Sequence, residues 1–576
     1  MLFYILYSRL RNMTITHRFA PADFTDTEKY IDVLHQYLTQ AKQPRFVVYA
    51  DYDVDGVTSG VTAGAALQIL GADLTNIVYP SMQTGFGLTQ TVVQQLKKSF
   101  APGQEIVLVT ADNGISLTSD SLQLPENWHL LVTDHHEGLE TLPPMADAVI
   151  DPFRHDQPDA GSFNGYAGVG VVWKVMLAYA DKYGTDEQYR RIEDLVPLVA
   201  LGTVCDQMQI IDENKHIVDA GLTYWNNRDL MQKLIDTSCQ RDQATKYQIA
   251  SIESRVFQFI HDYMDYDSWC HHVTTNTFGW SIGPLINSSR RMTEKSELAY
   301  QLFLAPTQQD QATAYRLLND LNKQRRKVSQ QAADEIIAQF ANQVIMPDQL
   351  LVGITPTKLG ICGLIASKVA NEFQCPTIIL TSDPGHFGQG SARTALDVDI
   401  LDVVTQIDHT QSGLLAAYGG HQAACGLSVA ATTPEELEQF AQQMMDLGSS
   451  IIQKSYPGAV KAALAASRRP EHSFDSWDSF KGQHLEQMQH GQSHLIEVQS
   501  VPVSTIRQIL SMSRAEMNSG VFVDASAHLQ KLELSNRAFA QLKALADTDQ
   551  VALFGYLSKP RALSLAKRTF YVEQLI

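Results

Sequence analysis

The chain has 576 residues, of which 44% are hydrophobic and 19% charged, a balance that describes an ordinary globular protein of several domains. A formal net charge of −19 argues against nucleic-acid binding through overall positive charge, although metal ions can neutralise aspartates that gather in one cleft. The six cysteines include no Cys-x-x-Cys pair, which argues against a zinc knuckle or a disulfide framework, and a cytoplasmic location fits best.

The first 44 residues are expected to form an N-terminal extension. Its opening, MLFYILYSRLRNM, has an apolar patch too short to span a bilayer, and the basic residues follow the patch. We therefore expect a first structural element, or an upstream start before Met13, and no signal peptide. No other run is long and apolar enough to cross a membrane, so no membrane partner is expected.

From residue 45 to about 150, short β-rich runs alternate with helical stretches. Strands are expected at 45–50, 105–111, 129–133 and 147–150, and helices at 57–71 and 89–99. The strand runs are apolar on nearly every residue, as are strands buried on both faces. This pattern is typical of a doubly wound α/β sheet with parallel strands.

The rest of the chain suggests four further parts. Residues 165–310 have a mostly helical pattern, so the first domain is expected to span 45–314, and 315–345 is predicted to be a connector helix. A second α/β pattern covers 346–455. Residues 456–576 suggest strands and a small β-rich module of unclear fold, for which oligonucleotide binding is one option.

Acidic and imidazole side chains follow the predicted strands, where each strand ends. Asp51, Asp53 and Asp55 follow the first strand, Asp112 the next, and the triplet at 134–136, Asp-His-His, the third. Because the carboxyl ends of parallel strands share one edge of a sheet, these side chains should converge. If the first segment is extended, Asp53 and Asp55 point the same way, and Gly56 permits a sharp exit into the helix.

Carboxylates combined with imidazoles form a ligand set for Mn²⁺ or Mg²⁺, and Asp206 in GTVCDQM adds another acid. The set exceeds what one ion needs, which favours two ions and in-line displacement at phosphorus. A single Asp-x-Asp is equally compatible with a turn or a helix cap, and a structural metal site needs only about four ligands. The full set, drawn from four segments, favours catalysis.

The motifs DYDVDG, ADNGIS, TDHHE and VALGTVCDQM, in this order and spacing, resemble those of the DHH phosphoesterase superfamily. The stretches AGVGVVWKV and YGGHQAACGLSV resemble the RecJ branch of single-strand-specific exonucleases. The resemblance covers residues 45–430. It implies a DHH domain, a connector helix and a DHH-associated domain that closes over the metal site and contacts the substrate.

The resemblance also implies roles for individual residues. The implied metal ligands are Asp53, Asp55, Asp112, His135 and Asp206. Asp53 would bind a first ion, Asp112 would bridge, and the other three would bind a second ion. His136 would face the scissile phosphate as a catalytic residue, and Asp51 would support catalysis or cap the loop. Mn²⁺ is the expected metal, with Mg²⁺ as the alternative.

Substrate contacts are implied in both domains. The matching residues are Asn287, Arg291, Ser391, Arg393, Gly419, Gly420 and His421. A guanidinium fork suits a phosphate, and glycines let backbone amides approach one closely. The sequence departs from the family pattern in three places: Arg290 and Ala50 stand where glycine is usual, and Ser81 where a basic residue is usual. The usual signature of an oligonucleotide-binding module is not evident after residue 456.

The function implied is that of a two-metal 5′-to-3′ exonuclease that acts on single-stranded DNA and releases mononucleotides, in DNA repair or recombination. A single-strand-binding protein or a helicase would be the partner, and we expect a monomer. One alternative is a phosphodiesterase for short oligonucleotides or cyclic dinucleotides. The other is a replication scaffold without activity, against which the intact ligand set argues.

Overall fold

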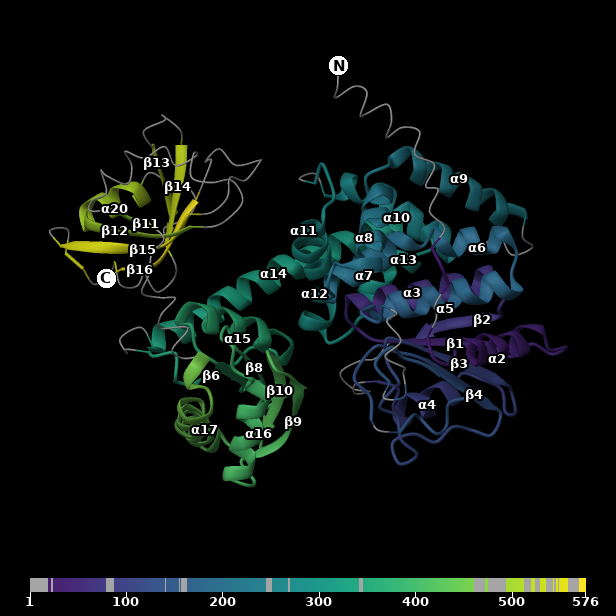
Figure 1. The fold of residues 1–576 in the computed structure, drawn as a ribbon, viewed down its shortest axis with the longest axis horizontal. Coiled ribbons are helices and arrows are strands. Elements are labelled where there is room, and N and C mark those ends of the chain that lie inside the picture. The colour runs from purple at the N-terminus through teal and green to yellow at the C-terminus, as the bar shows by residue number, and fades with distance from the viewer. Residues whose placement is uncertain are drawn as a thin grey trace, which may run out of the picture. The chain divides into compact units, whose positions relative to one another are not determined.

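A computed structural model of the chain shows two compact units, Met1–Gln324 and Arg325–Ile576 (Figure 1). The residues that it describes are 19–21, 24–78, 87–139, 141–154, 156, 163–244, 251–267, 270–340, 345–459, 472–474, 494–511, 519–523, 529–534, 542, 545–546, 549–557 and 569–575. None of the helices in these ranges combines the length and apolar character that a membrane crossing requires. The six cysteines are free, as expected.

The first unit is built on a five-stranded parallel sheet with the order β2-β1-β3-β4-β5. The strands are β1 (Arg45–Ala50), β2 (Leu74–Val78), β3 (Ile106–Ala111), β4 (Trp128–Thr133) and β5 (Ala148–Ile150). Both faces are buried: Phe46 and Val48 of β1 belong to one apolar core, and Val47 and Tyr49 to another. The predicted strands are confirmed to within one residue, whereas β2 was not predicted.

Helices cover both faces of this sheet, as the doubly wound pattern requires. Side chains of α2 (Thr27–Thr39), α3 (Val54–Ile69) and α5 (Gly168–Tyr183) belong to the core on one face. Those of α4 (Gln90–Lys97) belong to the core on the other. The α/β fold prediction is therefore confirmed.

A helical layer follows α5 in the chain. Its elements are α6 (Asp186–Glu193), α7 (Val196–Cys205), α8 (Asp212–Trp225), α9 (Arg228–Ala244), α10 (Ile252–Tyr266), α11 (Thr275–Thr277), the π-helix η1 (Phe278–Ile282), α12 (Gly283–Thr293) and α13 (Glu297–Leu304). The long helix α14 spans Gln308–Phe340, so it begins before the predicted residue 315, and the unit boundary falls within it.

The second unit begins with a mixed sheet whose strand order is β6-β7-β8-β10-β9. The strands are β6 (Leu351–Thr355), β7 (Thr377–Thr381), β8 (Gln389–Arg393), β9 (Leu415–His421) and β10 (Ala424–Val429). Only β6 and β7 are parallel; the other neighbours are antiparallel. Side chains of α16 (Ile400–Thr410) and α17 (Pro434–Ser455) join the core on one face, and α15 (Leu359–Phe373) contacts β7 and β8.

The C-terminal region is rich in β-structure, as predicted. Its described residues form a six-stranded sheet of β11 (His472–Phe474), β12 (His494–Pro502), β13 (Ser519–Val523), β14 (Leu529–Leu534), β15 (Gln550–Leu557) and β16 (Thr569–Leu575). One helix, α20 (Val503–Ser511), follows β12 directly.

Candidate functional site

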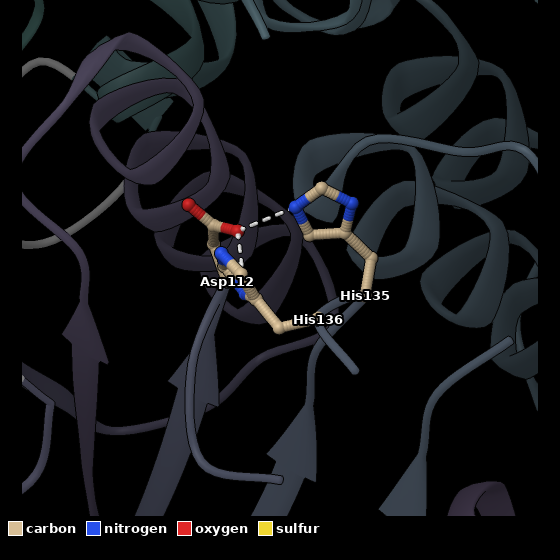
Figure 2. Close-up of side chains that lie close together, drawn as sticks. All are labelled: Asp112, His135 and His136. Atoms are coloured by element: carbon tan, nitrogen blue, oxygen red, sulfur yellow. Dashed lines mark ion pairs between the residues drawn. The ribbon is translucent and has the colours of Figure 1, made fainter. Parts of the chain in front are cut away.

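The acidic and imidazole side chains converge at the carboxyl edge of the first sheet. Figure 2 shows Asp112, which follows β3, pointing toward His135 and His136, which follow β4. Nε2 of His135 lies 3.2 Å from Oδ1 of Asp112, and Nδ1 of His136 lies 3.9 Å from the same oxygen. Donor atoms from two neighbouring strands thus meet at one point.

Two further groups overlap with this one. Asp55, His135 and Asp206 form the first, and Asp51, Asp53 and Asp112 the second, with the candidate ligand atoms of each group within 4.8 Å of one another. Nε2 of His135 lies 3.6 Å from Asp55 and 3.7 Å from Asp206. Every residue that the sequence suggested as a metal ligand, together with Asp51 and His136, lies in this cluster.

The loop that carries the first three aspartates is partly helical. Asp53 is the N-cap of α3, its side chain accepting a hydrogen bond from the Gly56 amide at 3.0 Å, and Asp55 lies in the first helical turn. The expectation of an extended segment is therefore wrong, because the helix starts at Val54 and the cap fixes Asp53. A Cβ at Gly56 would lie 2.4 Å from the backbone of Asp51, so glycine permits close packing here rather than a sharp exit.

The N-terminus of α5 fixes Asp55. Its two carboxylate oxygens accept hydrogen bonds from the amides of Gly168, at 2.7 Å, and Val169, at 3.0 Å. The positive end of the helix dipole favours the carboxylate at this place. Burial nevertheless raises the pKa of Asp55 above its ordinary value, opposed by the charge of His135 and by these hydrogen bonds.

Asp112 is the most constrained of the acids. Its backbone has a φ of 64°, which only a small fraction of non-glycine residues adopt. Its Oδ1 is buried and accepts no hydrogen bond from the described residues, although Nε2 of His135 is close. Burial, and then the neighbouring Asp55 and Asp53, raise the pKa of Asp112 well above its usual range.

These features fit a bound divalent cation. Oδ1 of Asp51 is also buried without a hydrogen-bond partner among the described residues, and burial also raises the pKa of this acid. Partnerless buried carboxylate oxygens are costly unless a cation binds them. A Cβ on Gly168 would lie 2.5 Å from Oδ1 of Asp112, so the glycine keeps space beside that oxygen. The oxygen-rich donor set with one or two imidazoles suits Mn²⁺ or Mg²⁺.

His136 is oriented by Asp134. Nδ1 of His136 lies 2.7 Å from Oδ1 of Asp134, which also accepts from the His135 amide, while its Oδ2 accepts from the Ile115 amide. Burial opposes protonation of His136, but the hydrogen bond and charge of Asp134 outweigh it and raise the pKa of the ring to about 9. Burial also acts to raise the pKa of Asp134, yet its hydrogen bonds, above all that with His136, hold it below the ordinary value.

The sequence analysis missed one acid at this edge. Asp151 follows β5 directly, is fully buried, and its Oδ2 has no hydrogen-bond partner in the described part of the chain. Burial and the charge of Asp134 raise its pKa to about 8. The signal was present, because an acid follows this predicted strand as it follows the others.

The side chains that hold the acidic loop were also missed. Tyr300, on α13, donates to the carbonyl oxygen of Asp51 at 2.8 Å, and Ser296 donates to that of Tyr52 at 3.4 Å. The guanidinium of Arg290, on α12, lies over the Tyr52 ring, 3.3 Å from its centroid. No sequence pattern indicates these contacts, since they join segments more than 230 residues apart.

The predicted substrate residues of the first unit lie on α12. Asn287 and Arg291 are one helical turn apart and half-buried, so they occupy one face of the helix. Ser81, one of the three departures from the family pattern, lies outside the described residues.

The second unit aligns its motifs by strand register. One row across three strands contains Arg393, Ala424 and His421, and the row two positions away contains Ser391, Gly426 and Gly419. Residues in register, and residues two apart on a strand, share a face of the sheet, so the Ser-x-Arg and Gly-Gly-His motifs present their side chains together. Gly420, between them, has a φ of 147°, and a Cβ there would lie 2.5 Å from the Ala424 carbonyl oxygen.

On this face of the sheet, the positions beside Arg393 include two glycines, which have no side chain. A Cβ on Gly419 would meet no atom within 4 Å among the described residues, and one on Gly426 would meet only two carbonyl oxygens at 4.0 Å. A Cβ on Gly363 of α15 would lie 2.6 Å from the Arg393 guanidinium. The two open glycines therefore form a flat floor next to a fixed cation, which we call the glycine floor.

Two family models match the chain. The DHH family N-terminal domain matches residues 45–203, and the DHHA1 domain matches residues 350–447. Among curated proteins, the single-stranded-DNA-specific exonuclease RecJ of Haemophilus influenzae is 29% identical over 407 residues, covering 68% of this chain and 65% of the relative. The RecJ of Escherichia coli is 26% identical over 437 residues, covering 73% and 68%. The chain thus spans about two thirds of the length of these relatives.

Solved structures share the fold. A crystal structure of exonuclease RecJ bound to manganese aligns with a TM-score of 0.58 and 20% identity, covering 77% of this chain and 99% of that one. RecJ of Thermus thermophilus, in complex with Mn²⁺, aligns with a TM-score of 0.61 and 18% identity, covering 97% and 72%. The chain therefore contains a DHH family N-terminal domain followed by a DHHA1 domain, and its predicted resemblance to RecJ is confirmed.

Proposed function

We propose that this protein is a two-metal phosphodiesterase that degrades single-stranded DNA from the 5′ end and releases mononucleotides. The observation that carries the proposal is Asp112, a residue of two of the three overlapping donor groups, whose buried Oδ1 accepts no hydrogen bond from the described residues. An oxygen in that position suits a carboxylate that bridges two cations. The RecJ relatives, which are named as single-stranded-DNA-specific exonucleases, support the substrate class.

In this proposal, Asp112 would be shared between the two ions. Asp53 would hold the first ion, with Asp51 beside it, and Asp55, His135 and Asp206 would hold the second. When bound, the two ions would place positive charge beside the scissile phosphate and lower the pKa of a water nucleophile. Mn²⁺ is the proposed metal, because the donor set includes an imidazole, and Mg²⁺ is the alternative.

His136 would bind the scissile phosphate. Asp134 engages Nδ1 of the ring, which leaves Nε2 for the substrate, and the hydrogen bond and charge of Asp134 favour the protonated ring. A charged N–H donor forms stronger hydrogen bonds with a phosphate oxygen than a neutral one does. Asp134 is therefore a positioning residue that sets both the orientation and the charge of His136.

The strand itself would be held by backbone contacts. Asn287 and Arg291 on α12 would bind its phosphates from the first unit. Ser391, Arg393 and His421 would do so in the second unit, where the glycine floor leaves room for a sugar-phosphate chain. Contacts with phosphates do not depend on the base sequence, and an exonuclease that degrades any sequence needs contacts of this kind.

The cellular setting follows from this activity as part of the same proposal. An enzyme that consumes single strands would act in DNA repair or recombination, in the cytoplasm and as a monomer. A helicase or a single-strand-binding protein would supply its substrate. Neither alternative, an enzyme for short oligonucleotides or an inactive scaffold, is favoured by the exonuclease relatives.

A metal titration on matched substrates tests the proposal. Purified protein would be offered a single strand, a blunt duplex of equal length and a dinucleotide, each with Mn²⁺, Mg²⁺ or EDTA. We expect metal-dependent loss of the single strand and little loss of the duplex. Faster cleavage of the dinucleotide than of the strand would favour the short-oligonucleotide enzyme, and no cleavage with either metal would favour a scaffold.

A further inference from the structure

Arg290 is a cation beside the acidic loop, at a position where the family pattern has glycine. Its guanidinium carbon lies 3.3 Å from the centroid of the Tyr52 ring, which is the distance of direct stacking. Tyr52 stands between Asp51 and Asp53, two members of one candidate metal group. The stack therefore holds a fixed positive charge next to the metal centre.

The polar edge of this guanidinium is unused. An arginine carries five N–H donors, and the Arg290 side chain makes no hydrogen bond or ion pair with any residue in the described ranges. The residue is half-buried, and none of its nitrogen atoms is among the buried side-chain atoms that lack a partner in the described part of the chain, so these N–H groups remain accessible from solvent. An accessible guanidinium edge is well suited to bind an anion.

A purely structural role does not require the charge. Two other contacts already hold the loop backbone, from Tyr300 to Asp51 and Gly56 and from Ser296 to Tyr52. An uncharged side chain of similar length would pack on the Tyr52 ring without leaving donors unpaired. The contacts thus leave the charge and the N–H groups of Arg290 without a structural purpose.

The net charge of the metal site suggests a purpose for the charge and the N–H groups of Arg290. Two divalent ions would carry four positive charges against the five carboxylates of Asp51, Asp53, Asp55, Asp112 and Asp206, so the loaded centre would still be negative. Each DNA phosphate adds a further negative charge, and a nearby cation would offset that repulsion. Arg290 is close enough for its charge to act on Asp51.

We propose that Arg290 binds a backbone phosphate of the single strand at the metal centre, with Tyr52 fixing the face of the guanidinium and its edge N–H groups binding the phosphate oxygens. This inference rests on the proposed function and adds a residue specific to this chain. Because a planar fork both stacks and binds a phosphate through two donors, lysine would replace it poorly.

The test measures strand binding as a function of salt. The probe is a fluorescent oligothymidine of roughly 20 nucleotides with phosphorothioate linkages, long enough for usual single-strand sites. Binding is followed by anisotropy with Mn²⁺ at several KCl concentrations, for the wild type, Arg290→Ala and Arg290→Lys. Arg316→Ala is the matched control, because Arg316 is an exposed arginine on α14 that bonds only within its own helix. Thermal unfolding and Mn²⁺ calorimetry accompany each variant.

We expect Arg290→Ala to weaken binding roughly tenfold or more and to reduce the slope of log affinity against log salt by about 0.7, the value for one lost phosphate contact on a single strand. Arg290→Lys should keep the slope but lose part of the affinity. Neither variant should bind Mn²⁺ more weakly than the wild type, because removing a positive charge beside the ions does not weaken their binding.

An unchanged slope in folded Arg290→Ala would overturn the inference while leaving the proposed function intact. So would weakened Mn²⁺ affinity with an unchanged slope, because that result would mark Arg290 as a brace of the acidic loop. Wild-type protein that binds no single strand at all would instead overturn the proposed function, and this inference with it.

Discussion

Nε2 of His135 lies 3.2 Å from Oδ1 of Asp112, and the two residues follow neighbouring parallel strands, β4 and β3. Both side chains are polar and ionisable, so their burial at the edge of a sheet requires an explanation. Their approach places an imidazole nitrogen beside a carboxylate oxygen that accepts no hydrogen bond from the described residues. We propose that the two residues are ligands of the same cation.

Replacing Asp112 should abolish the activity. Asp112→Ala removes the proposed bridging oxygen, so we expect metal-dependent cleavage of single strands to fall by at least roughly 10²- to 10³-fold. Calorimetry should also show weaker or fewer Mn²⁺ sites. Asp219→Asn, at an exposed aspartate of α8, is the matched control and should retain wild-type activity. Full activity of Asp112→Ala would contradict the assignment.

Filling the space beside Asp112 should also prevent metal binding. A Cβ on Gly168 would lie 2.5 Å from Oδ1 of Asp112, whereas one on Gly279 would meet no atom within 4 Å among the described residues. We therefore expect Gly168→Ala to reduce Mn²⁺ affinity by roughly tenfold or more, and Gly279→Ala to leave it unchanged. Calorimetry on both variants provides the comparison, and equal Mn²⁺ affinities would show that the space is not needed.

The charge of His136 should depend on Asp134. In metal-free protein, the pKa of His136 is expected at about 9 because of the hydrogen bond and charge of Asp134. Asp134→Asn removes that charge while burial still opposes protonation, so the pKa should fall from about 9 toward the ordinary 6.5. Titration of the imidazole resonances by NMR measures this directly. A His136 pKa that stays near 9 in the variant would assign the shift to another group.

Metal removal should destabilise the protein more at high pH than at low pH. Burial raises the folded-state pKa of Asp206 from 3.8 to about 8, so between these values the folded carboxyl keeps a proton that the unfolded chain has lost. Stability without metal should therefore decrease as pH rises through this window, and bound Mn²⁺ should replace the missing protons. Melting temperatures with EDTA and with excess Mn²⁺, at about pH 5.5 and about pH 8, give the comparison. An equal Mn²⁺ effect at both would argue against these carboxyls as ligands.

A side chain on the glycine floor should block the substrate without unfolding the protein. Gly419→Val adds atoms where the described structure has none within 4 Å, so the melting temperature should change little. Strand binding should fall by roughly tenfold if DNA lies on this surface, since the added side chain prevents close approach of a sugar-phosphate chain. Ala416→Val, at an exposed position of the same strand, is the control. Normal binding by Gly419→Val would remove the floor from the substrate path.

The sequence predicted the sheet and the acids at its edge because burial on both faces produces long apolar runs, and each run is followed by an acid. It did not predict β2, since Leu74–Val78 includes polar Thr75 and Asn76 and pairs with only one neighbour, β1. It also misjudged the acidic loop as extended. The helix begins at Val54 because Asp53 caps it, and a cap that is also a candidate ligand cannot be distinguished by spacing alone.

The contacts that complete the site depend on tertiary structure. Tyr300 and Arg290 reach the loop at 51–53 from segments more than 230 residues away, and only the fold brings them there. The same holds for the rows in the second unit, where strand register, rather than sequence spacing, aligns Ser391 with Gly419. Asp151 is different, because its position directly after a predicted strand was enough to suggest it as a site residue, although it belongs to none of the family motifs.

Degradation of end-labelled strands tests the central claim most directly. A single strand labelled at either its 5′ or its 3′ end is incubated with Mn²⁺ and the wild-type protein, with Asp112→Ala as the inactive reference. We predict that the 5′ label appears in mononucleotides from the earliest times, while the 3′ label remains on progressively shorter strands. Early release of the 3′ label as mononucleotides, or no difference between the wild type and Asp112→Ala, would contradict the account.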